Sequence, residues 1–341
     1  MASLATKRGL LVREVMPWVT EYADCVDSEL NALYPANGAT HLERAVSDAL
    51  SVGGKRVRAT LSLLWCEALS GDYRPAIPLA VAYELAHASA LVQDDIIDHS
   101  DMRRGGESIV AKYGISTAIL ASDLLLFNVP KMVAKYDGME SRRLAKIFDL
   151  VGEACRATTW GEFLDQEMAR SRENTEGDYE RMIKLKTSTL LSAPCASGAI
   201  VGGATDEQMM MAGKFGESLG IAYQIQDDML DLVGDESALG KPVFTDLRGG
   251  KKCLVFIHCA SRCSAEDKEF IFSLLNRTGP YSESEISRLR SLIDRHGSLD
   301  YAHEQVVLHT AAAKAALLAL RDSKAKSFLV ELADYLSTRY Y

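Results

Sequence analysis

Two acidic clusters, more than a hundred residues apart, repeat the pattern Asp-Asp-x-x-Asp, each directly preceded by Gln. On a helix, positions i and i+4 lie about 40° apart and position i+1 falls to one side, so each cluster presents three carboxylates on one flank. The aspartates are Asp94, Asp95 and Asp98 in the first cluster and Asp227, Asp228 and Asp231 in the second.

Both clusters lie in apolar runs, residues 88–97 and 219–232, where carboxylates are costly to bury unless a partner neutralises them. Mg²⁺ prefers oxygen ligands and is usually held by few protein carboxylates, with substrate phosphates in other positions. Either cluster alone could be a solvated acidic face. The matched pair instead predicts a metal clamp around a polyphosphate.

Basic residues that could contact such an anion directly occur in local pairs. Lys55 and Arg58 follow two glycines and open a helical pattern, three residues apart on one face. The segment has no Walker pattern. Arg103 and Arg104 follow the first acidic cluster, and arginine suits bidentate phosphate contact. Further candidates, each of which alone would be ordinary surface polarity or charge, are Lys186, Thr187, Lys241 and Lys251.

From residue 42 to residue 252 these motifs resemble the trans-isoprenyl diphosphate synthases, or polyprenyl synthetases. The resemblance implies a Mg²⁺-dependent prenyltransferase that condenses isopentenyl diphosphate with an allylic diphosphate in trans, head to tail. The pyrophosphate leaving group could itself take the final proton, so no general base is assigned. The resemblance also implies that the six aspartates hold three Mg²⁺ ions on the allylic diphosphate.

The resemblance assigns the remaining site residues as well. Contacts to isopentenyl diphosphate are implied for Lys55, Arg58, His87 and Arg104. Contacts to the allylic diphosphate or stabilisation of the developing cation are implied for Arg103, Lys186, Thr187, Gln224, Lys241 and Lys251. Of two adjacent lysines, Lys251 is preferred to Lys252 by its spacing from Asp246.

Product length depends on where a large side chain first blocks the apolar cavity beside the first cluster. Farnesyl-making members of the family often carry aromatics four or five residues before the first aspartate, where this chain has Ala90 and Ser89, and Ala86 one turn deeper is also small. The first aromatic on the Asp94 flank is Tyr83, about 16 Å away along a helix. If Tyr83 forms the floor of the cavity, the product should have twenty to twenty-five carbons, and geranylfarnesyl diphosphate is the favoured product. The alternative is that Tyr83 is only a core residue and another helix sets the floor.

Hydrophobic periodicity predicts an all-α fold, a single domain over residues 1–341 with roughly ten or more helices around a central apolar cavity, of isoprenoid synthase type. Helices are expected at residues 58–70, 75–98, 108–136, 141–169, 178–202, 206–233, 252–262, 284–296 and 303–337. Breaks are expected at residues 171–178, 234–250 and 277–284, which are rich in Gly, Asp, Ser and charge. The second of these follows an acidic cluster and is expected to be a mobile lid.

Composition limits the partners. A net charge of -9 argues against nucleic acid and anionic membranes. The 7 cysteines are scattered and are expected to be reduced, although Cys259, Cys263 and His258 could in principle bind a metal. The longest apolar stretch, residues 115–134, contains two charges and a proline, so no integral membrane segment is expected. These features predict a cytoplasmic protein, and the apolar surface of residues 108–136 would suit a homodimer.

Two other functions remain open at this level. A terpene cyclase also carries an aspartate-rich motif, but its second site typically has the form Asn/Asp-x-x-Ser/Thr-x-x-x-Glu, and Lys55 and Arg58 would then serve no second diphosphate. A non-catalytic regulatory subunit of a prenyl synthase would be expected to have lost one cluster. Both clusters are intact here, which favours the prenyltransferase.

Overall fold

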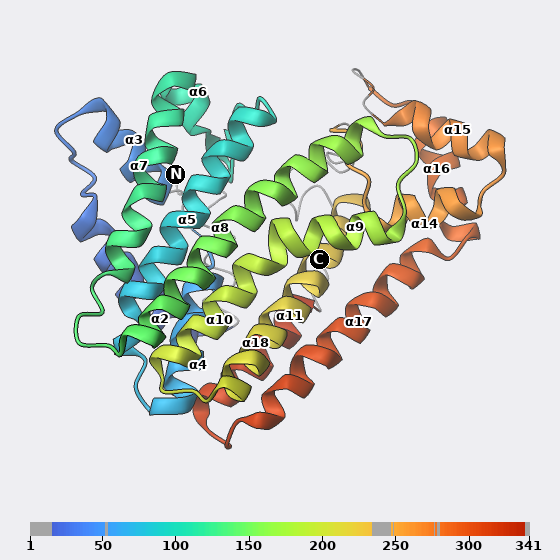
Figure 1. Cartoon of the computed structure of the whole chain (residues 1–341). Coiled ribbons are helices and arrows are strands. Elements are labelled where there is room, and N and C mark those ends of the chain that lie inside the picture. The colour runs from blue at the N-terminus through green and yellow to red at the C-terminus, as the bar shows by residue number, and fades with distance from the viewer. Residues whose placement is uncertain are drawn as a thin grey trace. The chain divides into compact units, whose positions relative to one another are not determined.

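The computed structural model describes residues 16–51, 54–233, 247, 249–275, 277 and 280–337. Most of them are helical (Figure 1). Contacts divide the chain into two compact units, and helices α8, α11 and α18 contribute residues to both. The first unit comprises residues 1–156, 190–214 and 317–329, and the second comprises residues 157–189, 215–316 and 330–341.

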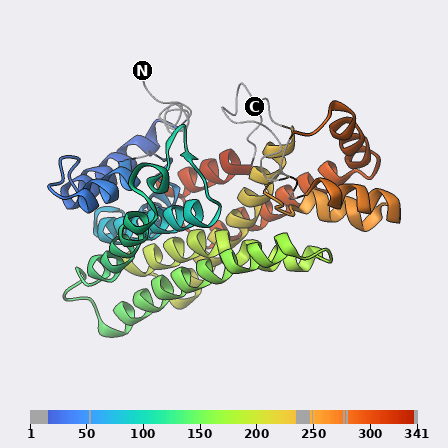
Figure 2. The same ribbon diagram turned by 90° about the horizontal axis from the view of Figure 1, so that it is seen from above.

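The first unit contains the N-terminal helices and the first acidic cluster. α8, a helix of 30 residues, begins here and is drawn in green in both views (Figures 1 and 2). The elements are α2 (Trp18–Leu33), α3 (His41–Ser51), α4 (Val57–Ser70), η1 (Arg74–Ala76), α5 (Ile77–Ile97), β1 (Met102–Arg103), β2 (Gly106–Glu107), α6 (Ile109–Tyr113), α7 (Ile115–Val133), α8 (Ser141–Arg170), α10 (Thr189–Val201), the start of α11 (Asp206–Val233), η3 (Leu317–Ala319) and the start of α18 (Lys324–Ser337).

The second unit contains the second acidic cluster, near the C-terminal end of α11. Its core joins the end of α8, α9 and α11 to the helices that follow residue 253. Its elements, besides the ends of α8, α11 and α18, are α9 (Glu176–Ile183), η2 (Lys184–Ser188), α14 (Leu254–Arg262), α15 (Ala265–Leu274), α16 (Glu283–Arg295) and α17 (Ser298–Ala316). Capping boxes start two of them, with Thr175 and Asp178 at α9 and Ser282 and Glu285 at α16.

Helix α5 is the core helix of the first unit and carries the first acidic cluster. Pro78 lies in its first turn, where a missing N–H costs nothing. Its buried residues fall on every side, from Leu79 to Val92, because α5 packs against α2, α3, α4, α6 and α7. A helix enclosed in this way can hold the aspartates of its last turn at fixed positions.

The all-α prediction is confirmed, whereas several boundaries are wrong. The helix expected at 108–136 is two helices that break at Gly114, and the one at 178–202 contains a π-helical turn, η2. The helix expected at 303–337 is three elements, and α2, α3 and α15 were not expected. Apolar periodicity persists across the single residue Gly114 and through the π-helical turn, which is why it does not reveal these two interruptions. The single-domain organisation and the central cavity stay predictions.

Among the residues that the structure describes, two helices are long and apolar enough to cross a membrane by length and composition alone, Arg74–Ile97 and Ile115–Val133. The first window is 67% buried within the protein, as is common for a core helix, and the second is 39% buried. The sequence shows residues 115–134 as the longest apolar stretch, and the first of the two helices contains the shorter apolar run at 88–97. Length and composition are therefore weak evidence for a membrane segment here.

Candidate active site

The first acidic cluster lies at the C-terminal end of α5. Asp94 and Asp95 are in the last turn, and Asp98 is the C-cap, whose N–H donates to the Asp94 carbonyl. Asp95 is buried, Asp94 is half-buried and Asp98 is exposed. Burial raises the pKa of the Asp95 carboxyl, although its bonds to Arg103 act in the opposite direction.

One arginine holds both members of the aspartate pair. Arg103, on β1, donates from Nη2 to Asp94 Oδ2 at 2.6 Å and from Nε to Asp95 Oδ1 at 2.7 Å. The hairpin of β1 and β2 thus folds back onto the end of α5. Arg103 supplies the positive charge that the buried Asp95 requires.

The donor set at this end of α5 fits a hard divalent cation. Within the described ranges, no three Asp, Glu, His or Cys side chains are grouped so that they could hold an ion by themselves. Asp94 and Asp95 nevertheless present carboxylate oxygens to one cation, Arg103, and carboxylate oxygens completed by substrate phosphates are the ligands that Mg²⁺ prefers.

A basic group surrounds His87, on α5. Burial and then the charges of Arg58, Arg104, Arg56 and Arg103, in that order, lower the pKa of His87 well below its usual value. The imidazole is therefore neutral at pH 7. Several arginines gathered around a neutral histidine form a region suited to an anion.

The glycine before Lys55 allows one of these arginines to approach the backbone. A Cβ at Gly54 would lie 2.8 Å from Arg104 Nη1, so a side chain at this position would displace the guanidinium. Gly54 thereby brings Arg104 beside the segment that carries Lys55 and Arg58. Three of the predicted isopentenyl diphosphate contacts are neighbours for this reason.

The residues predicted to set product length are all on α5. Tyr83 is fully buried, and its hydroxyl lies 2.7 Å from Ser197 Oγ on α10. Ser89 is also buried, and its hydroxyl lies 2.9 Å from Ser122 Oγ on α7. Ala86 is buried and Ala90 is half-buried. Tyr83 falls about 20° from Asp94 around the helix, whereas Ser89 falls about 140° away and faces α7.

The three aspartates of the second acidic cluster differ in solvent exposure. Asp227 is exposed, Asp228 is half-buried and Asp231 is 1% exposed. Asp228 accepts hydrogen bonds on both oxygens, from Gln224 Nε2 at 2.8 Å and from the Tyr179 hydroxyl at 2.6 Å. In each cluster the second aspartate is therefore held by the protein, and the first is more exposed.

A hydrogen-bonded chain links this cluster to the π-helical turn η2. Thr187 donates to Gln224 Oε1 at 2.8 Å, and Gln224 in turn donates to Asp228. Gln224 thus fixes Thr187 and Asp228 relative to each other. Three of the residues predicted for the allylic site are brought together in this way.

Lys186, in the same turn, is held by two carboxylates that the sequence analysis did not single out. Its Nζ lies 2.7 Å from Glu162 Oε2 and 2.6 Å from Asp165 Oδ2, both on α8. Gly161 makes this approach possible, because a Cβ there would lie 2.2 Å from the Lys186 backbone nitrogen. Two acidic residues three apart in the predicted helix 141–169 were the available signal.

The adjacent lysines near residue 251 have different roles. Lys252 is buried, and its Nζ donates to the carbonyls of Met168 at 2.5 Å and Ala169 at 3.0 Å, and also to that of Ser171. This ammonium caps the C-terminal end of α8. Lys251 is half-buried. The predicted contact Lys241 lies outside the described residues, as does most of the expected lid at 234–250.

Comparisons with known proteins give one consistent result. A family model described as polyprenyl synthetase matches residues 39–293. A short chain isoprenyl diphosphate synthase of Methanothermobacter thermautotrophicus is 32% identical over 326 residues, which cover 96% of this chain and 99% of that protein. A geranylfarnesyl diphosphate synthase of Aeropyrum pernix is 34% identical over 297 residues, which cover 85% of this chain and 92% of that protein.

A solved structure agrees with these matches. The geranylgeranyl pyrophosphate synthetase of Pyrococcus horikoshii superposes with a TM-score of 0.88 at 33% sequence identity. The superposition covers 96% of this chain and 99% of that one. The similarity therefore extends over both units, beyond the motifs themselves.

Proposed function

This chain belongs to the polyprenyl synthetase family and is a trans-prenyltransferase, and from that premise we propose that it makes a prenyl diphosphate of twenty to twenty-five carbons. Enzymes of this family use isopentenyl diphosphate, an allylic diphosphate and Mg²⁺. The observation that carries the proposal is the pair of aspartate clusters in a chain of this family, the first held by Arg103 and the second by Gln224 and Tyr179. A terpene cyclase and a non-catalytic subunit are both less compatible with it.

Breaking the allylic carbon–oxygen bond produces a delocalised cation and a pyrophosphate with several negative charges, so stabilisation of the leaving group is the main catalytic requirement. Bound Mg²⁺ would supply much of that stabilisation by neutralising phosphate oxygens, and three ions are proposed. The more exposed aspartates, Asp94, Asp98 and Asp227, would bind these ions. Asp95, Asp228 and Asp231 would also contribute to holding them. Arg103 would move from the aspartate pair to the allylic diphosphate.

The remaining allylic contacts in this proposal are Lys186, Thr187, Gln224, Lys241 and Lys251. Glu162 and Asp165 orient the ammonium of Lys186, so it can face the diphosphate without a conformational search. Thr187 and Gln224 are neutral dipoles that can face the developing cation without forming a covalent bond to it. Lys251 is favoured over Lys252, because Lys252 is committed to the end of α8. Lys241 remains part of the proposal.

Isopentenyl diphosphate would bind to the basic group around His87. Lys55, Arg58 and Arg104 provide positive charge, and the neutral imidazole of His87 can donate a hydrogen bond to a phosphate oxygen. The departing pyrophosphate would accept the final proton. No separate general base is required.

Product length is assigned to the flank of α5 between Asp94 and Tyr83. Small residues occupy the positions nearest the cluster, and Tyr83 is a large buried side chain eleven residues before Asp94. Geranylfarnesyl diphosphate is the product that this floor favours, and geranylgeranyl diphosphate is the nearest competitor. The relatives named above include a synthase of each kind.

The decisive experiment combines the purified protein with Mg²⁺, isopentenyl diphosphate and a farnesyl or geranyl diphosphate primer. Chromatography of the dephosphorylated products should show chains of twenty to twenty-five carbons. A cyclic hydrocarbon from the primer alone would identify a cyclase. Absence of any reaction until a second protein is added would identify a regulatory subunit.

A homodimer is also proposed. Ile115, Ile119, Leu120 and Phe127 are exposed on α7, with Phe127 68% exposed, and lie within about 140° of the helix circumference. An isologous contact through α7 would bury this face in a protein that works in the cytoplasm. Light scattering after size-exclusion chromatography should give a molar mass of twice the chain mass. Phe127→Glu should shift the measured mass toward that of a single chain. Sedimentation with phosphatidylcholine vesicles would instead indicate that α7 faces lipid.

A further inference from the structure

Arg56 lies between two predicted diphosphate contacts, Lys55 and Arg58, but its side chain points into the protein. Nε donates to Asp27 Oδ1 at 2.8 Å, Nη1 donates to Glu84 Oε2 at 3.0 Å, and Nη2 donates to the Leu50 carbonyl at 2.9 Å. The side chain is 10% exposed. Every nitrogen of the guanidinium thus has a partner within the first unit.

The backbone of Arg56 is fixed in an uncommon conformation. Its φ of 47° and ψ of 35° are left-handed, which a non-glycine residue adopts only when its surroundings enforce it. Arg56 is the N-cap of α4, and its own side chain makes no capping bond. The reversal at Arg56 determines where Lys55 and Arg58 lie on either side of it.

Glu84 enforces this turn from a neighbouring helix. One oxygen of its carboxylate accepts from Arg56 Nη1, and the other accepts from the N–H of Ala59, in the first turn of α4, at 3.2 Å. Glu84 is 4% exposed, on α5, one turn before His87. It therefore caps α4 from outside and links that cap to the helix that carries His87 and Asp94.

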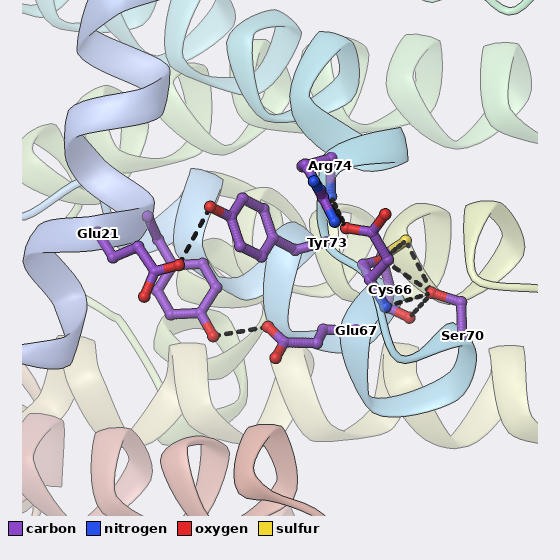
Figure 3. Close-up of polar contacts among 8 residues, drawn as sticks. Glu21, Cys66, Glu67, Ser70, Tyr73 and Arg74 are labelled. Atoms are coloured by element: carbon purple, nitrogen blue, oxygen red, sulfur yellow. Dashed lines mark hydrogen bonds and ion pairs between the residues drawn. The ribbon is translucent and has the colours of Figure 1, made fainter.

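Asp27 connects the same guanidinium to α2, which precedes the matched region at residues 39–293. Separate contacts attach α2 to the C-terminal end of α4 and to Tyr73, which follows that helix. Tyr22 donates to Glu67 Oε2 at 2.6 Å, and Tyr73 donates to Glu21 Oε1 at 3.3 Å (Figure 3). α2 therefore has anchors that do not involve Asp27, and loss of the Asp27 charge should leave the helix docked.

We propose that Arg56 is a positioning residue for the isopentenyl diphosphate site, and that Asp27 and Glu84 hold it in place. The proposal rests on the proposed function, because it assumes that Lys55 and Arg58 bind a diphosphate. Arg56 contributes no direct phosphate contact. Helix α2 is by this route part of the substrate-binding apparatus.

Asp27→Asn is the most informative variant, because it keeps the size of the side chain and removes the charge that faces Arg56 Nε. It should raise KM for isopentenyl diphosphate by about tenfold and leave KM for the allylic substrate and kcat within about twofold. Arg56→Lys should act in the same direction, because an ammonium cannot satisfy three divergent partners. Calorimetric titration with isopentenyl diphosphate alone should show the same loss of affinity.

Tyr22→Phe is the matched control. It removes the hydrogen bond from α2 to Glu67 at the far end of α4 and should lower the melting temperature without changing either KM. If Asp27→Asn lowers the melting temperature as Tyr22→Phe does and leaves isopentenyl diphosphate affinity unchanged, Arg56 is only structural and the proposal is wrong. An equal rise in both KM values would also overturn it. Wild-type protein that forms no prenyl product would instead contradict the proposed function.

Discussion

The Nη2 atom of Arg103 lies 2.5 Å from Oδ1 of Asp95, a carboxylate with 3% of its side chain exposed. This ion pair favours the charged form of a buried aspartate at the end of α5, against the effect of burial on its pKa. Replacing Arg103 by Ala should therefore destabilise the protein by about 1–3 kcal/mol, because an uncompensated carboxylate remains. Urea unfolding measures this loss. Mg²⁺ should restore more stability to Arg103→Ala than to wild type, and an equal effect on both would argue against a shared cation position.

Metal dependence follows from the aspartate clusters. Asp94→Asn and Asp227→Asn should each lower kcat by about a thousandfold or more, because stabilisation of the leaving group is lost. Helical content by circular dichroism should not change. EDTA should abolish wild-type activity, and added Mg²⁺ should restore it. The control Asp322→Asn changes a fully exposed carboxylate and should leave kcat unchanged. Normal turnover in Asp94→Asn or Asp227→Asn would show that this aspartate is not a required metal ligand.

The aspartate clusters, the basic pairs and the helical fold could be predicted because each repeats a residue type at a spacing that helix geometry explains. Arg103 was proposed because it closely follows the first cluster, and Lys186 was proposed from the family resemblance. Glu162, Asp165 and Tyr179 were missed, since each reaches its partner through tertiary packing that no local pattern encodes. The π-helical turn at Lys184–Ser188 was missed because it interrupts a helix without changing its composition.

The two diphosphate sites should separate in steady-state kinetics. Lys55→Ala and Arg58→Ala should each raise KM for isopentenyl diphosphate by about tenfold or more, because a charge-assisted contact is lost, with a smaller effect on the allylic substrate. Arg103→Ala should do the reverse, and Arg103→Lys should rescue only in part, since lysine cannot make both bonds. Equal changes for both substrates in all three variants would show that the assignment of residues to sites is wrong.

The two adjacent lysines should differ in what they support. Lys252→Met should lower the melting temperature, because three carbonyls at the end of α8 lose their donor. Lys251→Met should lower the melting temperature less than Lys252→Met does, and it should raise KM for the allylic substrate. Thermal unfolding and kinetics on both variants test this. A larger stability loss for Lys251→Met would reverse the assignment.

The pH dependence of stability should carry a contribution from His87. Burial and then the arginines lower its pKa well below the ordinary 6.5. Below about pH 6.5 the unfolded chain binds a proton at His87 that the folded chain does not. As the pH decreases below this value, the free energy of unfolding therefore falls, and this group contributes up to about 1.4 kcal/mol per pH unit. His87→Gln should flatten that decline in urea titrations at pH 5–7.

Product length tests whether Tyr83 is the floor of the chain-elongation cavity. Its hydroxyl bonds to Ser197 on α10, so the ring has a defined position. Tyr83→Ala should lengthen the products, because removing the ring opens space for about one further isoprene unit per helical turn of roughly 5.4 Å. Tyr83→Phe is the matched control, since it keeps the ring and loses only the hydrogen bond, and its products should match those of wild type.

The same mechanism predicts the opposite change nearer the aspartates. Ala90→Phe, which adds a ring about 40° from Asp94, should shorten the products toward fifteen carbons. Ser89→Phe should shorten the products by less than Ala90→Phe does, because Ser89 faces Ser122 of α7 and a ring there must displace that packing. Chromatography of dephosphorylated products measures each length. If the wild type makes mainly fifteen carbons, or if Tyr83→Ala and Ala90→Phe leave the distribution unchanged, another helix sets the floor.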